Sequence, residues 1–200
     1  FFIGGAINFS GEIFTQQNGQ KFTSSKLIDS QKMEEDIDCI FFDADNDQDQ
    51  DLLITGGDIQ YSENSINYKP RLYLNDGEGH FTLQAYSIPD SIKTIASCVS
   101  SADFDGDGDQ DLFIGGRVSK SYPMAPRSYL LQNNNGVFTD VTSKICPELL
   151  HPGMVTAAVW TDFDNDHQID LVLAGEWMPL RFFKNNQGLL SEITTSTGLQ

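Results

Sequence analysis

The chain has 200 residues, of which 29 are acidic and 12 are basic, so its formal net charge is −17. This acidity argues against partners such as nucleic acid or anionic membrane surfaces, which would repel it. A hydrophobic content of 39% is ordinary for a folded protein, and no apolar run is long enough to predict a transmembrane helix.

The first five residues, Phe-Phe-Ile-Gly-Gly, match residues 112–116, which directly follow an acidic stretch further along the chain. We therefore expect an acidic loop upstream of residue 1 and a chain that is part of a longer protein. Residues 12–17 predict a strand, Asn18–Gly19 a hairpin turn, and Phe22 the start of the next strand.

The acidic stretch at residues 103–111 carries an aspartate at every second position and runs straight into an apolar, β-prone segment. Two carboxylates about 4 Å apart repel by roughly 4 kcal/mol at an effective dielectric of 20, so five converging carboxylates need a cation. Ligands that are all oxygen favour Ca²⁺. We interpret the stretch as a calcium loop, with side chains at positions 1, 3, 5 and 9 and a backbone carbonyl at position 7.

The same stretch recurs at residues 43–51 and 162–170, at intervals of 60 and 59 residues, each time with Leu directly after the ninth position. The three loops contain 14 of the 29 acidic residues, so three bound Ca²⁺ ions would change the formal charge from −17 to −11. A single stretch of this kind could be a solvated acidic turn, but three at a constant period indicate a structural repeat.

Each loop is the centre of a unit with about four short strands in some 60 residues. Helix is scarce, with a turn or two expected at residues 90–96 and 142–150. This pattern predicts an all-β fold, a partial β-propeller built of four-stranded blades. We treat the chain as one segment of about three and a third blades, whose units span approximately residues 1–30, 31–90, 91–150 and 151–200.

Two other classes of calcium site are excluded. An EF-hand needs a Glu at position 12 and flanking helices, but position 12 is Ile54, Ile114 or Leu173. Glycine-rich nonapeptide repeats have a period of nine residues instead of about 60.

Loops of the form Asp-x-Asp-x-Asp-Gly-x-x-Asp-Leu in β units of this length resemble FG-GAP (VCBS) repeats, as in the propellers of integrin α-chains. The second half also resembles the exported proteins related to cartilage acidic protein, which often carry a further ASPIC/UnbV-type domain. The segments that carry this narrower resemblance are Gly115–Arg117, Ala125–Leu131, Pro152–Val155, Trp160–Asn165 and Gly175–Pro179.

The resemblance implies a seven-bladed propeller that is stabilised by calcium and located outside the cytoplasm, either extracellular or in the cell envelope. It implies up to three Ca²⁺ ions and one set of ligands for each loop. The implied side-chain ligands are Asp43, Asp45, Asp47 and Asp51; Asp103, Asp105, Asp107 and Asp111; and Asp162, Asp164, Asp166 and Asp170, with the carbonyls of Asp49, Asp109 and Gln168.

Position 6 departs from the family pattern, which prefers Gly, because it is Gln48 in the first loop and His167 in the third. A side chain is disfavoured at positive φ, so we expect these two loops to bind more weakly or to curl differently. The second loop is expected to be the tightest site.

No local motif predicts a catalytic triad, and the cysteines at 39, 98 and 146 are expected to be small buried residues. The best candidates for a ligand patch are Arg117, Arg127, Glu176 and Trp177, with an internal ion pair as the alternative explanation.

The sequence therefore predicts a non-catalytic, calcium-binding interaction or adhesion module. Its expected partners are a protein or carbohydrate ligand and the remaining blades or a further domain of the same chain, without nucleic-acid binding or membrane insertion. The alternative is a propeller enzyme, most plausibly one that acts on carbohydrate, with its active site on the variable loops.

Overall fold

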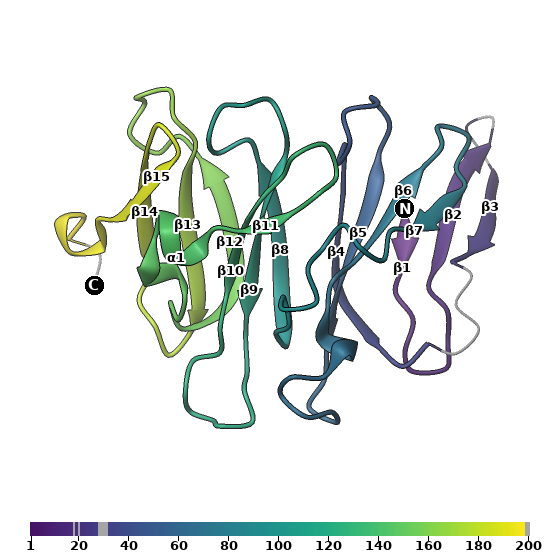
Figure 1. Cartoon of the computed structure of the whole chain (residues 1–200), viewed down its shortest axis with the longest axis horizontal. Helices are drawn as coiled ribbons and strands as arrows, with labels where there is room; N and C mark the ends of the chain where they lie inside the picture. The colour runs from purple at the N-terminus through teal and green to yellow at the C-terminus, as the bar shows by residue number, and fades with distance from the viewer. Residues whose placement is uncertain (18, 20, 28–31, 199–200) are drawn as a thin grey trace.

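A computed structural model describes residues 1–17, 19, 21–27 and 32–198, and shows four antiparallel sheets that follow one another in chain order (Figure 1). The first sheet has three strands and the other three have four each. Asn18 of the expected hairpin turn lies outside the described residues. The strands are β1 (Phe2–Ile3), β2 (Glu12–Gln17), β3 (Lys21–Lys26), β4 (Glu35–Phe42), β5 (Asp51–Gly57), β6 (Arg71–Asn75), β7 (Phe81–Leu83), β8 (Ala96–Ala102), β9 (Asp111–Gly116), β10 (Tyr129–Gln132), β11 (Thr139–Asp140), β12 (Met154–Thr161), β13 (Asp170–Glu176), β14 (Arg181–Asn186) and β15 (Leu189–Glu192).

The second strand of each four-stranded sheet contributes to the core: β5 and β9 are buried on both faces, and β13 is buried through Leu171 and Leu173. Successive side chains of a strand point to opposite faces. In β9, Leu112 and Ile114 therefore pack into the cluster shared with the preceding sheet, whereas Phe113 packs into the cluster shared with the following sheet. This two-sided burial explains why the sequence after the first two acidic loops is a continuous run without a polar alternation.

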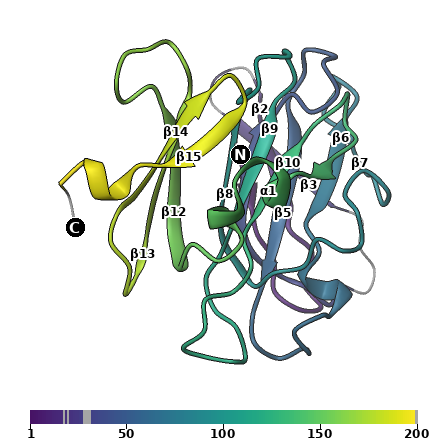
Figure 2. The ribbon, with the colours of Figure 1, turned by 60° about the vertical axis from the view of Figure 1, so that its left-hand side comes forward.

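The first strands of the four-stranded sheets lie next to one another, since β8 packs against both β4 and β12. Each of these strands is bulged once, between Asp36 and Asp38, between Ala96 and Cys98, or between Val155 and Ala157. Figure 2 shows the sheet of β12–β15 (green to yellow) inclined to the sheet of β8–β11. Sheets that meet along their first strands and splay outwards are blades, so the expected all-β partial propeller is confirmed.

Helix is confined to short pieces. The expected turns after β11 are present as α1 (Thr142–Ile145) and a 3-10 helix η2 (Pro147–Leu149), and further 3-10 turns occur as η1 (Ile66–Tyr68) and η3 (Thr194–Ser196). The expected helical turn at residues 90–96 is wrong, because this segment makes a turn and then leads into β8 in extended form. No helix among the described residues has the length and apolar character to cross a membrane.

Candidate metal centres and loop surface

The three acidic loops occupy the same place in successive blades. They connect β4 to β5 (loop 1, residues 43–51), β8 to β9 (loop 2, residues 103–111) and β12 to β13 (loop 3, residues 162–170). They lie along the upper edge of the molecule as drawn in Figure 1. The first and second strands of each blade are antiparallel, so each loop reverses the chain at the end of a hairpin.

Each loop brings the carboxylates of positions 1, 3 and 9 together. One oxygen from each of the three lies within 4.8 Å of the other two. This limit is about twice the Ca–O distance of 2.3–2.6 Å, so one ion can contact all three carboxylates. The three groups are Asp43, Asp45 and Asp51; Asp103, Asp105 and Asp111; and Asp162, Asp164 and Asp170.

The aspartate at position 9 also anchors the loop to the blade. In loop 2 the buried Asp111 accepts a hydrogen bond from the Phe104 amide (3.1 Å) on one oxygen and from the Asn133 amide (2.8 Å) on the other. Asp51 and Asp170 accept bonds from the equivalent amides in loops 1 and 3. Position 9 therefore joins the start of the loop to the third strand, a role that the spacing of carboxylates did not predict.

The aspartate at position 5 stands outside the convergent groups. Its carboxylate accepts a hydrogen bond from the amide of position 7, over 3.0 Å in Asp47 and 2.9 Å in both Asp107 and Asp166. This Asx-turn holds the second half of the loop. Whether Asp47, Asp107 and Asp166 bind metal, as the resemblance implies, stays a prediction, and so do the carbonyls of Asp49, Asp109 and Gln168.

Positions 4 and 6 have positive φ in all three loops. The φ values at position 6 are 75° for Gln48, 98° for Gly108 and 68° for His167. The expectation that Gln48 and His167 make their loops curl differently is therefore wrong. The left-handed conformation costs a non-glycine residue roughly 1–2 kcal/mol, which Gly108 avoids.

The electrostatics of the loops favour a bound cation. Buried oxygens of Asp43 and Asp45 have no hydrogen-bond partner among the described residues. Burial, and then the neighbouring Asp47, raises the pKa of Asp45. Burial raises the pKa of Asp51 to about 6 and that of Asp111 to about 7. Unpartnered oxygens and raised carboxylate pKa values are what a positive ion would relieve, so the residues fit a hard metal ion.

Neighbouring loops are joined by a buried asparagine at the end of the third strand in the blades of loops 2 and 3. The Asn133 side chain donates to the Ala44 carbonyl of loop 1 (2.8 Å) and to the Gln110 carbonyl of loop 2 (3.1 Å), and accepts from the Gly136 amide (2.9 Å). Asn185 makes the same three bonds between loops 2 and 3. The loops are therefore one connected layer across three blades.

Loop 3 differs from the others because it contacts a lysine. The Lys184 ammonium forms ion pairs with Asp164 and, at 2.9 Å, with Asp166. The residue at the same place in loop 2 is Gln132, whose amide donates to Asp105. In the blade of loop 1 it is Leu74, which packs against the apolar core.

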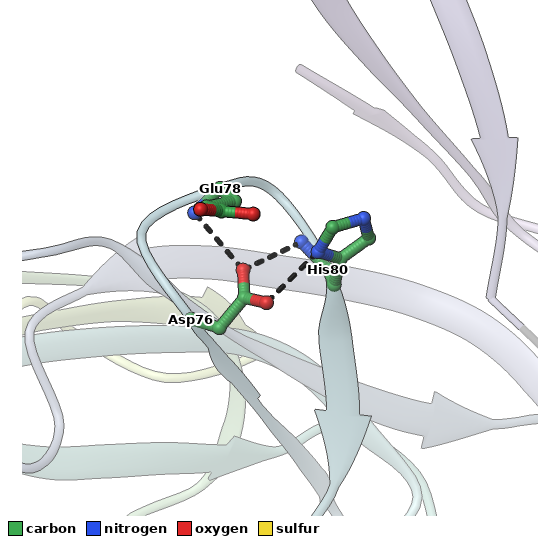
Figure 3. Close-up of side chains that lie close together, drawn as sticks. All are labelled: Asp76, Glu78 and His80. Carbon is green, nitrogen blue, oxygen red and sulfur yellow. Dashed lines mark hydrogen bonds and ion pairs between the residues drawn. The ribbon is translucent and has the colours of Figure 1, made fainter.

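A fourth acidic group, which sequence reasoning missed, lies in the exposed hairpin turn between β6 and β7 (Figure 3). Asp76 accepts hydrogen bonds from the amides of Glu78 (2.9 Å) and His80 (3.1 Å), and its carboxylate contacts the His80 ring at 2.8 Å. The His80 ring is the main cause that lowers the pKa of Asp76 to about 2. Because the carboxylate is already engaged, we interpret this group as turn structure.

The two arginines of the proposed ligand patch pair with different carboxylates. Arg117 pairs with Glu176 at 2.6 Å, and Trp177 beside them is 80% exposed, with its ring 5.7 Å from that of Tyr122. Trp177 has a φ of 57°, which is unusual for a bulky residue. Tyr122 was not predicted, because no sequence signal connects residues on the loops of two different blades.

Arg127 belongs to a different environment. It pairs with Asp140 at 2.7 Å and its guanidinium lies 4.9 Å from the centre of the Tyr129 ring. It lines a cavity of about 480 Å³ with His151 and Met124, whereas Arg117 and Glu176 do not line it. The partners of Arg127 therefore differ from those of Arg117.

Comparison with known proteins gives one family match. Residues 43–114, which run from the start of loop 1 through loop 2 and most of β9, match the family model described as FG-GAP-like repeat. No curated protein matches the chain. The matched segment contains two of the three convergent carboxylate groups and one complete interval between loops. Residues 43–114 of this partial β-propeller are thus similar to an FG-GAP-like repeat.

Proposed function

We propose that the chain is a non-catalytic propeller segment in which Ca²⁺ stabilises the three acidic loops and the opposite ends of the blades bind a partner. The observation that carries this proposal is that all three loops bring carboxylates of positions 1, 3 and 9 together in one geometry. A single acidic turn could arise without a metal, but the same convergence in three blades requires repeated neutralisation of repelling charges.

The role of the ion would be structural. Each group includes a buried aspartate that holds the third strand, so an ion at the loop would tie together three strands of the blade. Calcium suits these loops better than magnesium, because it accepts six to eight oxygens in flexible geometry whereas magnesium demands a near-ideal octahedron.

The partner would bind where the blades differ from one another. The connections after β5 and β9 are long and those after β13 are short, and the pair of Trp177 and Tyr122 is displayed there with the Arg117–Glu176 ion pair. Exposed Trp, Tyr and Arg side chains are enriched at binding hot spots. A protein or a carbohydrate partner would both suit this surface.

The location would be extracellular or in the cell envelope, where free calcium is high enough to fill such sites. The narrower relation to the exported proteins related to cartilage acidic protein rests on the sequence pattern of residues 115–179.

The test is thermal unfolding with Ca²⁺, with Mg²⁺ and with EDTA, paired with calorimetric titration. We expect a calcium-specific rise in Tm, because a ligand at 1,000 times its Kd stabilises the folded state by about 4 kcal/mol. Asp103→Asn should remove a large part of this rise, whereas Glu63→Gln, an exposed acidic residue outside the loops, should not. Equal Tm values in Ca²⁺ and EDTA would refute the structural role of calcium.

A further inference from the structure

The three loops offer a bound ion different surroundings at one particular position. This position directly precedes the asparagine at the end of the third strand, and it holds Leu74, Gln132 or Lys184. The equivalence is structural, because in every blade the amide of the following asparagine donates to the position-9 aspartate. The series runs from an apolar side chain to a neutral donor to a cation.

Lys184 reaches the carboxylates that a metal would use. Its ammonium contacts Asp164, at position 3, and lies 2.9 Å from Asp166, at position 5. Asp164 is also part of the convergent group of loop 3. In loop 2 the same space is occupied by the neutral amide of Gln132, which donates to Asp105.

We propose that Lys184 is an internal cation that competes with calcium for loop 3, so that loop 3 fills only at a higher calcium concentration than loop 2. This inference rests on the proposed calcium binding and concerns how the same loops differ. An ammonium held about 4 Å from a divalent ion in water weakens its binding roughly thirtyfold. Because the Lys184 side chain is partly exposed and can turn away into solvent, we expect about a tenfold effect.

The competition has a second consequence in the absence of calcium. Lys184 already neutralises part of the charge of loop 3, whereas loops 1 and 2 have no lysine or arginine paired with their carboxylates among the described residues. Loop 3 should therefore be the best-ordered of the three loops in EDTA. The chain would then combine two loops that depend on calcium with one that keeps its shape without it.

The experiment is a calcium titration followed by ¹H–¹⁵N NMR, which reads the loops separately. The amides of Gly106 and Gly108 report on loop 2, and those of Asp166 and His167 on loop 3. The test variant is Lys184→Gln, which gives loop 3 the residue of loop 2. Its charge-matched control is Lys120→Gln, an exposed lysine beyond the far end of β9.

We expect Lys184→Gln to lower the calcium midpoint of loop 3 about tenfold and to leave loop 2 unchanged, while Lys120→Gln changes neither. The reciprocal variant Gln132→Lys should raise the midpoint of loop 2 by a similar factor, and it decides the matter if Lys184→Gln does not fold. Unchanged midpoints in both variants, in loops that still bind calcium, would overturn the competition and leave the proposed function intact. Failure of all loops to titrate in the wild type would overturn both.

Discussion

Asn133 is the residue whose removal should best show that the blades are joined through their loops. Its side chain is 1% exposed and makes three hydrogen bonds, to the carbonyls of Ala44 and Gln110 and from the amide of Gly136. The first of these bonds crosses from one blade to the next. Asn133→Ala removes all three and leaves the partner groups without their bonds.

The expected loss follows from these three bonds. A buried hydrogen bond contributes about 1 kcal/mol net, and each partner left unpaired costs about 1–3 kcal/mol. We therefore expect Asn133→Ala to lower the free energy of unfolding by about 3 kcal/mol. For a chain of this length that corresponds to a fall in Tm of about 6–12 °C.

The assay is urea unfolding followed by circular dichroism, in EDTA so that calcium does not mask the loss. The control is Asn134→Ala, because Asn134 is the exposed neighbour in the same turn and its side-chain oxygen accepts a hydrogen bond from Asn135 within that turn. Asn185→Ala is an independent repeat of the test, since Asn185 makes the same bonds one blade further on. If Asn133→Ala and Asn134→Ala differed by less than about 0.5 kcal/mol, the hydrogen bonds would not hold the blades together.

Two further predictions concern pH and the tryptophans. In EDTA the Tm should fall as pH rises from 5 to 8. The pKa values of Asp51 (about 6) and Asp111 (about 7) are raised, so the folded state binds more protons than the unfolded state in this range. Saturating calcium should abolish the dependence of Tm on pH, and a Tm in EDTA that rises with pH would contradict the prediction. Trp177→Ala should change the free energy of unfolding by less than about 0.5 kcal/mol, because the side chain is 80% exposed. Trp160→Ala should lower it by at least about 2 kcal/mol, because Trp160 packs against the core and stacks on Phe104. Equal losses in urea unfolding would show that Trp177 belongs to the core.

Much of the fold could be predicted from the sequence because the same pattern, an acidic loop followed by an apolar strand, occurs three times. The strand expected at residues 12–17 is β2, and those expected after loops 1 and 2 are β5 and β9. A single apolar run of this length could equally be a buried helix segment. Three runs that each follow an aspartate at position 9 share one explanation, which is why the blades were predictable and the unrepeated segment 90–96 was not.

The convergence of carboxylates was predictable for the same reason, but the different hydrogen-bonding roles of the individual carboxylates were not. Alternating aspartates at positions 1, 3, 5 and 9 look equivalent in sequence, yet position 9 binds two backbone amides and position 5 binds one. Which amides lie nearby depends on the path of the third strand, which is about 20 residues away in the chain. The difference among Leu74, Gln132 and Lys184 was visible in the repeat, but only the structure shows that Gln132 and Lys184 reach the carboxylates of their loops.

The two ends of the blades differ in how tightly neighbouring blades pack there, and this explains where the repeat is strict and where it varies. At the loop end, a turn of one blade packs on the loop of the preceding blade: a Cβ on Gly188 would lie 3.0 Å from the Cβ of Asp105, and Gly136 is similarly close to Asp45. Changes there would disturb two blades at once. At the other end, Tyr122 and Trp177 touch each other outside the core, so substitutions there leave the blades intact. A repeat array of this kind can change its partner without changing its layer of acidic loops, because the residues that hold the loops and those that would meet the partner are on different connections of the same strands.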